Sequence, residues 1–383
     1  MMTKRKIIND PVYDGFLSVE DPVILQVIEH PYFQRQRRIK QLGLTYLVYP
    51  GAMHTRFSHM LGALNLMGRA LEVLRQKGVE ITDEECRGAK LAILLHDIGH
   101  GPFSHTSERV LVDVPHEEIT LLMMRRINEE MDERDRSGAN EASRPLDTAI
   151  AIFSNTYHKH FLHQLVSSQL DMDRLDYLGR DSFFTGVSEG IVGTDRIISM
   201  LNVHEDELVV DEKGIYSVEK FIISRRLMYW QVYMHKTVIA ADQLLLSILR
   251  RARELNLSPF TFSLSPLDLD RFAEVDDDDI MVAVKHWQHS DDEILSTLCR
   301  NLVNRRLPAI RISNDPFTDV VCDYFHGTGE LHNRSYDFND QEIKVLYKDG
   351  RCLPISEASD QLDRHFLEKQ VTKYYRFFPK ENA

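Results

Sequence analysis

The sequence lacks the patterns that mark membrane-spanning, disulfide-rich and zinc-finger proteins. No run approaches the roughly 18 apolar residues that a spanning helix requires, and no apolar stretch follows the basic start of the chain. We therefore expect no membrane partner and no secretory signal. The 383 residues contain four widely separated cysteines without a C-x-x-C pair, namely Cys86, Cys299, Cys322 and Cys352. This cysteine usage argues against a disulfide framework and fits a cytoplasmic protein.

Positive charge is also scarce. Lys and Arg total 46 against 59 for Asp and Glu, which gives a net charge of −13. This is the wrong sign for a protein that binds phosphate backbones over a wide surface, so we expect no nucleic-acid partner. An anionic substrate must then be held by a local basic cluster. One such cluster, which we interpret as a contact to nucleotide phosphate or to another subunit, comprises Arg35, Arg37, Arg38 and Lys40.

The apolar pattern predicts a mainly α fold. Apolar residues recur at three- and four-residue steps as far as about residue 258, and the clearest helix begins at the capping box of Thr82 and Glu85. We expect small β-hairpins at 208–216 and around the Asp349-Gly350 turn, a strand at 309–313, and a helix capped by the acidic string 276–279. These features predict a helical core with hairpin insertions over 1–255 and a smaller α+β C-terminal region over 256–383.

Six of the 17 histidines fall within one short part of the chain, and they are His54, His59, His96, His100, His105 and His116. The His96-Asp97 pair ends an almost wholly apolar helix, where an unpaired carboxylate would be costly without a nearby cation. For this dipeptide alone, an ordinary buried hydrogen-bonded pair is the alternative. His59 and Asp173, on two other segments, favour a divalent metal ion, because two His and two Asp leave positions open for water and a phosphate oxygen.

Several ordered motifs resemble those of the HD-domain deoxynucleoside triphosphate triphosphohydrolases. The resemblance is strongest to the branch that contains the mammalian SAM-and-HD-domain dNTPase and its bacterial homologues, and it runs from about Lys6 to about Arg305. The motifs are Gln41-Leu-Gly43, Val48-Tyr-Pro-Gly-Ala52, His54-x-Arg-Phe-x-His59, Leu95-His-Asp-Ile-Gly-His-Gly-Pro-Phe-Ser-His105 and Asp173-x-x-Asp-Tyr-x-x-Arg-Asp181. On this basis, residues 1–255 are expected to form an HD-type catalytic domain.

The resemblance implies one divalent metal ion, which could be Mn, Fe, Ni, Co, Mg or Zn. Its implied ligands are His59, His96, Asp97 and Asp173. A catalytic group beside the scissile phosphate is implied as well, with Glu108 orienting a histidine that protonates the leaving 5′ oxygen. That group comprises His100, His105, Glu108 and His116.

The resemblance also implies how a deoxynucleoside triphosphate would be bound. Gln41, Leu42 and Asp181 match contacts to the 3′-hydroxyl, while Tyr177 and Tyr233 match residues that pack on the sugar, where a tyrosine against C2′ would exclude a ribose. The implied triphosphate contacts are Arg56, Arg174, Arg225 and Lys236, and Arg174 replaces a lysine of the mammalian branch while keeping its charge. In the implied reaction, water attacks the α-phosphorus and inorganic triphosphate leaves.

Regulation and assembly follow from the same resemblance. It implies a homo-oligomer, either a dimer or a tetramer, and a nucleotide activator site with counterparts in Ile8, Asn9, Asp10 and Arg37. Glu29 and His30 stand where that site reads guanine, which argues against a guanine nucleotide as activator. Three alternatives stay open: an HD phosphohydrolase for deoxynucleoside monophosphates, cyclic nucleotides or nucleic acid, a non-catalytic nucleotide sensor, and an interaction protein without an active site.

Overall fold

The structure, a computed structural model, describes residues 5–13, 15–112, 114–136, 144–262, 266–318, 321–333, 336–337 and 341–380. As far as residue 200, the elements are β1 (Lys6–Asn9), β2 (Phe16–Val19), α1 (Pro22–Glu29), α2 (Pro31–Arg35), α3 (Arg56–Gln76), α4 (Asp83–Leu95), α5 (Glu108–Leu111), α6 (His116–Arg136), α7 (Asp147–Phe153), α8 (His160–Gln164), α9 (Met172–Thr185) and α10 (Thr194–Met200). They are followed by β3 (Leu201–His204), β4 (Glu207–Asp211), α11 (Ile215–Met228), α12 (Lys236–Glu254), α13 (Pro266–Glu274), α14 (Asp277–Trp287), α15 (Glu293–Val303), β5 (Ala309–Ser313), β6 (Gly327–Asn333), β7 (Lys344–Leu346), β8 (Cys352–Pro354), α16 (Ile355–Ala358), α17 (Arg364–Glu368) and β9 (Val371–Phe378).

The fold is mainly α, as the sequence predicts, and helices α3, α4 and α9 form its centre. Helix α4 begins at the predicted capping box, where the Thr82 hydroxyl accepts from the Glu85 amide at 3.1 Å and the Glu85 carboxylate accepts from the Thr82 amide at 2.8 Å. Its apolar residues from Leu91 to Leu95 are wholly buried, because α3 packs on one side and α7 on another. The end of this buried helix therefore lies deep in the molecule.

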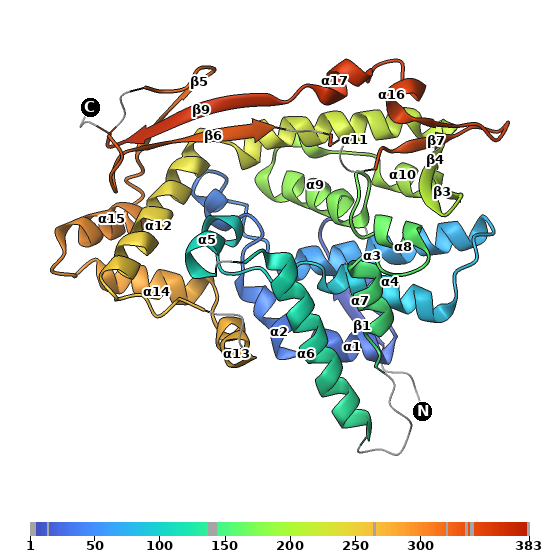
Figure 1. Ribbon diagram of the computed structural model, residues 1–383, viewed down its shortest axis with the longest axis horizontal. Helices are drawn as coiled ribbons and strands as arrows, with labels where there is room; N and C mark the ends of the chain where they lie inside the picture. Colours follow the sequence, from blue (N-terminus) through green and yellow to red (C-terminus); the bar gives the residue numbers. More distant parts are fainter. Residues whose placement is uncertain are drawn as a thin grey trace.

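Three small sheets accompany the helices. Their strand orders are β1-β2, β3-β4-β7-β8 and β5-β9-β6, and the last of these lies along one side of the molecule, next to α12 (Figure 1). The strand predicted at 309–313 is β5, and the predicted Asp349-Gly350 turn joins β7 to β8, with Gly350 at φ 86°.

The hairpin predicted at 208–216 exists, but its predicted position was wrong. The turn joins β3 to β4 at Glu205 and Asp206, which have φ values of 52° and 64°, whereas Lys213 and Gly214 precede α11. The prediction placed the turn at Gly214, because glycine is common in hairpin turns. In the structure, two non-glycine residues, Glu205 and Asp206, adopt the left-handed conformation at the turn.

Residues before and after the predicted division at 255 share one hydrophobic core. Strand β4 pairs in parallel with β7, so that Val210 lies opposite Val345, and the same buried cluster includes Leu61 and Leu295. The division into 1–255 and 256–383 remains a prediction. Among the described residues, no helix combines the length and the apolar character that crossing a membrane requires.

Candidate metal centre and active site

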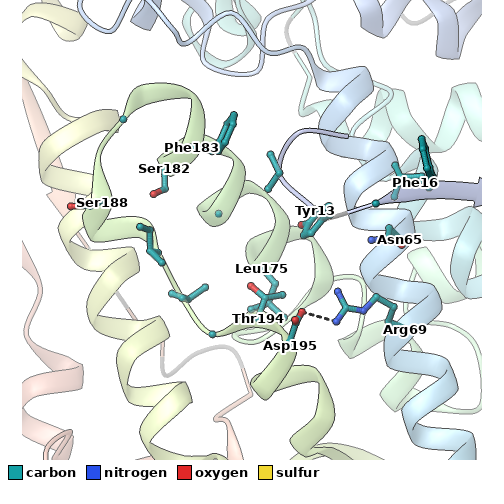
Figure 2. A pocket seen from close by; sticks show the side chains of 18 residues that line it. Tyr13, Phe16, Asn65, Arg69, Leu175, Ser182, Phe183, Ser188, Thr194 and Asp195 are labelled. Carbon is teal, nitrogen blue, oxygen red and sulfur yellow. Dashed lines mark hydrogen bonds and ion pairs between the residues drawn. The ribbon is translucent and has the colours of Figure 1, made fainter. Parts of the chain in front are cut away.

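Helix α9 presents two chemically different faces. Leu175, Gly179 and Ser182 line a cavity of about 800 Å³, which also takes in Arg69, ion-paired with Asp195 at 2.6 Å (Figure 2). No residue predicted to bind metal, phosphate or sugar is among the described residues that line this cavity. The candidate site lies instead on the face of α9 that carries three polar side chains at four-residue steps, namely Asp173, Tyr177 and Asp181.

Three elements bring the predicted metal ligands together. His59 lies in the first turn of α3, His96 directly follows α4, and Asp173 lies in the first turn of α9. Oδ1 of Asp173 is 3.1 Å from Nε2 of His59 and 3.2 Å from Nε2 of His96. Asp97 completes the group, since its Oδ1 is 3.4 Å from Nε2 of His96 and its Oδ2 is 3.9 Å from Nε2 of His59.

This donor set fits a divalent metal ion. Two atoms bound to one ion at about 2.1 Å are separated by roughly 3 Å, which matches the distances above. The buried Nε2 atoms of His59 and His96 face carboxylate oxygens, yet neither finds a hydrogen-bond partner of acceptable geometry among the described residues. Each ring uses Nδ1 instead, His59 toward Asp176 at 2.8 Å and His96 toward the carbonyl of Ile93 at 2.7 Å. Metal-bound histidines commonly make such a bond through their second nitrogen.

The charges at the site favour the protonated form of both histidines in the metal-free protein. Burial lowers the pKa of His59, but the carboxylates of Asp173 and Asp176 outweigh burial and raise that pKa to about 10. The pKa of His96 is likewise raised against burial, by Asp97 and Asp173. Burial raises the pKa of Asp97, yet His96 holds it well below its usual range. A bound cation would replace the protons in balancing these carboxylates.

A second group of donor atoms shares Asp97. One ligand atom each from Asp97, His100 and His116 lie within 4.8 Å of one another. The rings of His100 and His116 stack with their centroids 3.7 Å apart, and Nε2 of His100 is 3.4 Å from Oδ1 of Asp97. Two of the residues predicted to transfer protons therefore lie beside the predicted metal ligands. The side chains of the other two, His105 and Glu108, lie outside the part of the chain that the structure describes.

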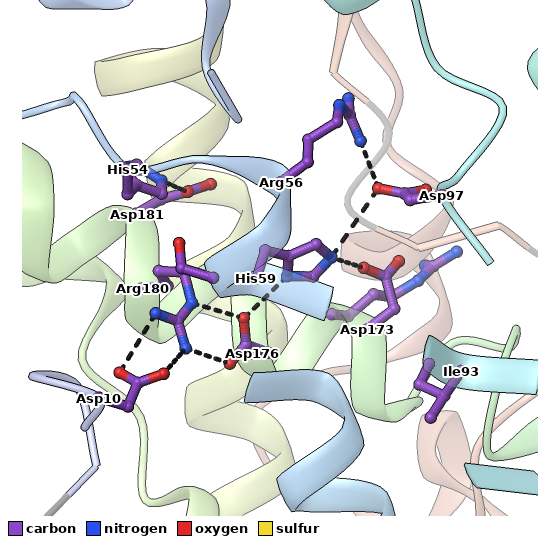
Figure 3. A network of polar contacts seen from close by, with 12 residues as sticks. Asp10, His54, Arg56, His59, Ile93, Asp97, Asp173, Asp176, Arg180 and Asp181 are labelled. Atoms are coloured by element: carbon purple, nitrogen blue, oxygen red, sulfur yellow. Dashed lines mark hydrogen bonds and ion pairs between the residues drawn. The ribbon is translucent and has the colours of Figure 1, made fainter. Parts of the chain in front are cut away.

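A buried network holds His59 from behind (Figure 3). Asp176 accepts hydrogen bonds from Nδ1 of His59 at 2.8 Å, Nε of Arg180 at 2.8 Å and the Tyr13 hydroxyl at 2.6 Å. Arg180 also donates to the two carboxylate oxygens of Asp10 at 2.7 and 3.2 Å. Sequence reasoning gave Asp176 no role and placed Asp10 in an activator site. The sequence did contain a signal for this network. Asp176 and Arg180 are four residues apart in the segment that carries Asp173, a spacing that places an acidic and a basic side chain on one face of a helix.

The residues predicted to contact the sugar also meet. Asp181 is buried, and its two oxygens accept from Nε2 of His54 and from the hydroxyl of Tyr233, each at 2.7 Å. The rings of Tyr177 and Tyr233 are 6.2 Å apart in an edge-to-face arrangement. Gln41 joins the group through its backbone amide, which donates to the backbone carbonyl of His54 at 3.0 Å. The side-chain oxygen of Gln41 is buried and has no hydrogen-bond partner in the described part of the chain.

Two of the four predicted triphosphate contacts are held close to the metal ligands. Arg56 forms an ion pair with Asp97 and donates from Nε and Nη2 to the Ser104 hydroxyl at 3.0 and 2.7 Å. Arg174, next to Asp173 in the chain, is ion-paired with Asp171 at 3.1 Å, and the pKa of its guanidinium is raised, since Asp171 outweighs burial.

The remaining predicted contacts lie around the tyrosines. Arg225, in the last turn of α11, lies 5.8 Å from the Tyr229 ring centroid, and its charge opposes the burial that raises the pKa of Tyr177. Lys236 is exposed at the start of α12, just after the turn that carries Tyr233. Leu42 is partly buried and packs against the core.

The side chains of the basic cluster at 35–40 mostly contact other residues of the same chain. Arg35 is 1% exposed, so its interpretation as a surface contact to phosphate or a subunit was wrong. Arg38 forms an ion pair with Asp276, Lys40 lies 3.4 Å from Asp277, and Arg37 stacks 3.5 Å above the Phe57 ring.

Comparison with known proteins agrees with this geometry. Residues 56–181 match the HD domain, and residues 192–323 match the HD associated region. The chain belongs to the HD-domain phosphohydrolases. A phosphohydrolase of known structure from Bacteroides thetaiotaomicron is 44% identical, with a TM-score of 0.91 over 98% of this chain and 100% of that chain.

Two curated relatives extend the comparison. An uncharacterized protein of Bacillus subtilis, YwfO, is 37% identical over 80% of this chain and 72% of its own length. The Dictyostelium discoideum homolog of the deoxynucleoside triphosphate triphosphohydrolase SAMHD1 is 31% identical over 60% of this chain and 46% of its own length. The chain thus spans less than half of the Dictyostelium protein, and the activity named for that relative supports only a proposal for this one.

Proposed function

We propose that the protein hydrolyses deoxynucleoside triphosphates to the deoxynucleoside and inorganic triphosphate. The observation that carries this proposal is the arrangement of Asp173, Tyr177 and Asp181 on one face of α9. Four-residue steps advance about 6 Å along a helix, so one face can serve a metal, a sugar ring and a sugar hydroxyl in succession. Among the relatives, the Dictyostelium homolog bears the name of a dNTP triphosphohydrolase, which supports the same substrate class.

The metal ion would be held by His59, His96, Asp97 and Asp173. When bound, such an ion neutralises phosphate charge and lowers the pKa of a coordinated water. Its identity among Mn, Fe, Ni, Co, Mg and Zn depends on availability as much as on these ligands.

The chain's own side chains would do the remaining work. Arg56 and Arg174 bind the phosphate oxygens on which charge develops, since guanidinium groups match phosphate in a bidentate way. The proton for the leaving 5′ oxygen comes from a histidine near Asp97, and His100 and His116 are the two whose side chains are described.

Sugar selection would depend on the group around Asp181. Its carboxylate, held by His54 and Tyr233, accepts a hydrogen bond from the 3′-hydroxyl, and Gln41 offers a buried amide oxygen that no described residue hydrogen-bonds. Tyr177 packs against C2′ and leaves no room for a second hydroxyl.

The test is turnover of each dNTP and its ribonucleotide counterpart, with Mn²⁺ or Mg²⁺, by the wild-type chain, Asp97→Ala and His160→Ala. We expect dNTP turnover that Asp97→Ala abolishes together with bound metal, whereas His160→Ala changes neither. His160 is a fair control because the partners of its ring among the described residues are Asn155, His163 and Gln341, none of which belongs to the proposed site. Equal turnover of ribonucleotides, or full activity in metal-free Asp97→Ala, would contradict the proposal.

We further infer from the family resemblance that the protein is a homo-oligomer, a dimer or tetramer, and from its cysteine usage that it is cytoplasmic. An activator site is less well supported, because Asp10 is occupied by Arg180 and His30 caps helix α2 through its ring.

A further inference from the structure

The acidic string at the start of α14 does more than cap the helix. Asp276 is the N-cap, in line with the helix cap that the sequence predicts for this string, and the structure adds a capping box with Asp279. Asp277 is different, because it is wholly buried and reaches away from its own helix. Its Oδ1 accepts from the Phe103 amide at 2.8 Å, and its Oδ2 accepts from the Lys40 amide at 3.0 Å. One carboxylate of the HD-associated region therefore joins the segment around Lys40 to the segment around Phe103, which lies within the HD match.

Both segments lead to Arg56. Lys40 is bridged to Thr55, and the Arg56 amide donates to the carbonyl of Ile39 at 3.0 Å, so the 39–41 segment fixes the backbone of Arg56. On the other side, Phe103 precedes Ser104, whose hydroxyl accepts two hydrogen bonds from the Arg56 guanidinium.

The Phe103–Ser104 turn depends on outside support. Phe103 and Ser104 have φ values of 54° and 47°, in the left-handed region that non-glycine residues rarely occupy. A backbone of this kind persists only where its surroundings fix it. The carboxylate of Asp277 supplies a charge-assisted hydrogen bond at this turn.

We propose that Asp277 is a positioning residue that sets Arg56, and through it Asp97, in the geometry that phosphate-ester hydrolysis requires. Asp277 touches neither metal ligand nor substrate in this account and acts through the two segments that flank Arg56. The inference rests on the proposed function only in naming a dNTP as the substrate. The role of Asp277 itself is also tested with a generic phosphodiester, which does not require a dNTP site.

A second side chain links the same three parts of the chain. Arg35, fully buried, donates from Nε to the carbonyl of Val275 at 2.7 Å and from Nη1 to the carbonyl of His100 at 3.0 Å. The start of α14 is thus joined to the loop after α4 by a cation as well as by an anion. These two links place the HD-associated region where it can position the loop after α4, which carries His100 and Ser104.

The test compares Asp277→Ala and Asp277→Asn with Asp278→Asn, which removes the same charge from an exposed neighbour in the same helical turn. Three quantities are measured on the full chain well below its unfolding temperature. They are kcat with Mn²⁺ on bis(4-nitrophenyl) phosphate and on dNTP, Mn²⁺ affinity by calorimetry, and hydrogen–deuterium exchange of peptides covering 38–41 and 99–107.

For Asp277→Ala, we expect kcat to fall about tenfold to a hundredfold, since small misplacements of a catalytic group have effects of this size. Exchange should accelerate in the two segments and not in α3 or α9, while Mn²⁺ affinity stays within about threefold. Asp277→Asn keeps an acceptor oxygen, so its kcat and its exchange rates should lie between those of Asp277→Ala and those of Asp278→Asn, which should match the wild type.

Three results would overturn the proposal: unchanged kcat in Asp277→Ala, a loss of kcat no greater than the loss of folded protein, or faster exchange spread over the whole core. If Asp277→Ala does not fold, the same criteria apply to Asp277→Asn. Absence of dNTP turnover in the wild type, with the phosphodiester contrast intact, would contradict the proposed function and leave the role of Asp277 supported.

Discussion

Nδ1 of His59 and Oδ2 of Asp176 are 2.8 Å apart in the wholly buried interior between α3 and α9. This bond orients the His59 ring so that Nε2 faces Asp173 and Asp97. Partners of this kind commonly change metal affinity 10- to 100-fold when removed.

We therefore predict that Asp176→Asn weakens Mn²⁺ binding by about 10- to 100-fold, with all four metal ligands present. Thermal stability should fall as well, because Arg180 keeps only Asp10 as a charged partner. Calorimetric titration measures the affinity. Asp195→Asn, which breaks the exposed ion pair with Arg69, is the control and should leave Mn²⁺ affinity unchanged. Equal affinities for the two variants would show that Asp176 does not orient His59.

Two glycines of α3 should respond in opposite directions to alanine. A Cβ at Gly62 would collide with the Asp176 carboxylate and the Arg180 guanidinium, whereas one at Gly68 would meet only Lys90, at an ordinary 3.5 Å. We predict that Gly62→Ala costs about 1–3 kcal/mol of unfolding free energy despite the better helix propensity of alanine. Gly68→Ala should gain about 0.5–1 kcal/mol. Chemical denaturation of the metal-free proteins measures both values, and a stabilised Gly62→Ala would contradict the packing.

Metal binding should release protons. The pKa of His59 is raised to about 10 in the metal-free protein, so its ring is protonated at pH 7, whereas a metal ligand must be neutral. Apparent Mn²⁺ affinity should therefore rise as the pH increases toward 10, by about tenfold per pH unit for each proton released. Titration calorimetry in two buffers of different ionisation enthalpy counts these protons. An affinity independent of pH, with the same enthalpy in both buffers, would argue against His59 as a ligand.

Removal of one hydroxyl should weaken substrate binding. Tyr233→Phe deletes the donor to Asp181, and a hydrogen bond to a charged group contributes about 1.5–3 kcal/mol. We predict that KM for dNTP rises about tenfold or more while kcat changes less. Tyr229→Phe is the matched control, because its ring packs 5.2 Å from that of Tyr233. Steady-state kinetics measure both constants, and equal KM values for the two variants would contradict a role of Tyr233 in sugar binding.

Local signals in the sequence predicted much of the fold. The capping box at Thr82 and the acidic string at 276–279 each predicted a helix start, and the β-prone run at 309–313 is strand β5. The turn at Glu205 and Asp206 could not be predicted, because non-glycine residues there adopt positive φ only under the constraint of the paired strands.

The candidate site was predictable only in part. Metal ligands could be proposed because several of their motifs lie next to helical apolar patterns, and the structure brings His59, His96, Asp97 and Asp173 together. The function of Asp277 was hidden, because which acid of 276–279 turns inward depends on how α14 packs against residues 40 and 103. Contacts between distant segments leave no local periodicity to detect.

The measurement that tests the central claim most directly is ³¹P NMR of the products formed from a dNTP by the metal-loaded protein. The account predicts inorganic triphosphate as the sole phosphorus product, together with the free deoxynucleoside, and only the resonances of unreacted dNTP with Asp97→Ala. Orthophosphate or pyrophosphate would contradict cleavage between the α-phosphorus and the 5′ oxygen, and an unchanged dNTP spectrum with every divalent metal would contradict dNTP hydrolysis altogether.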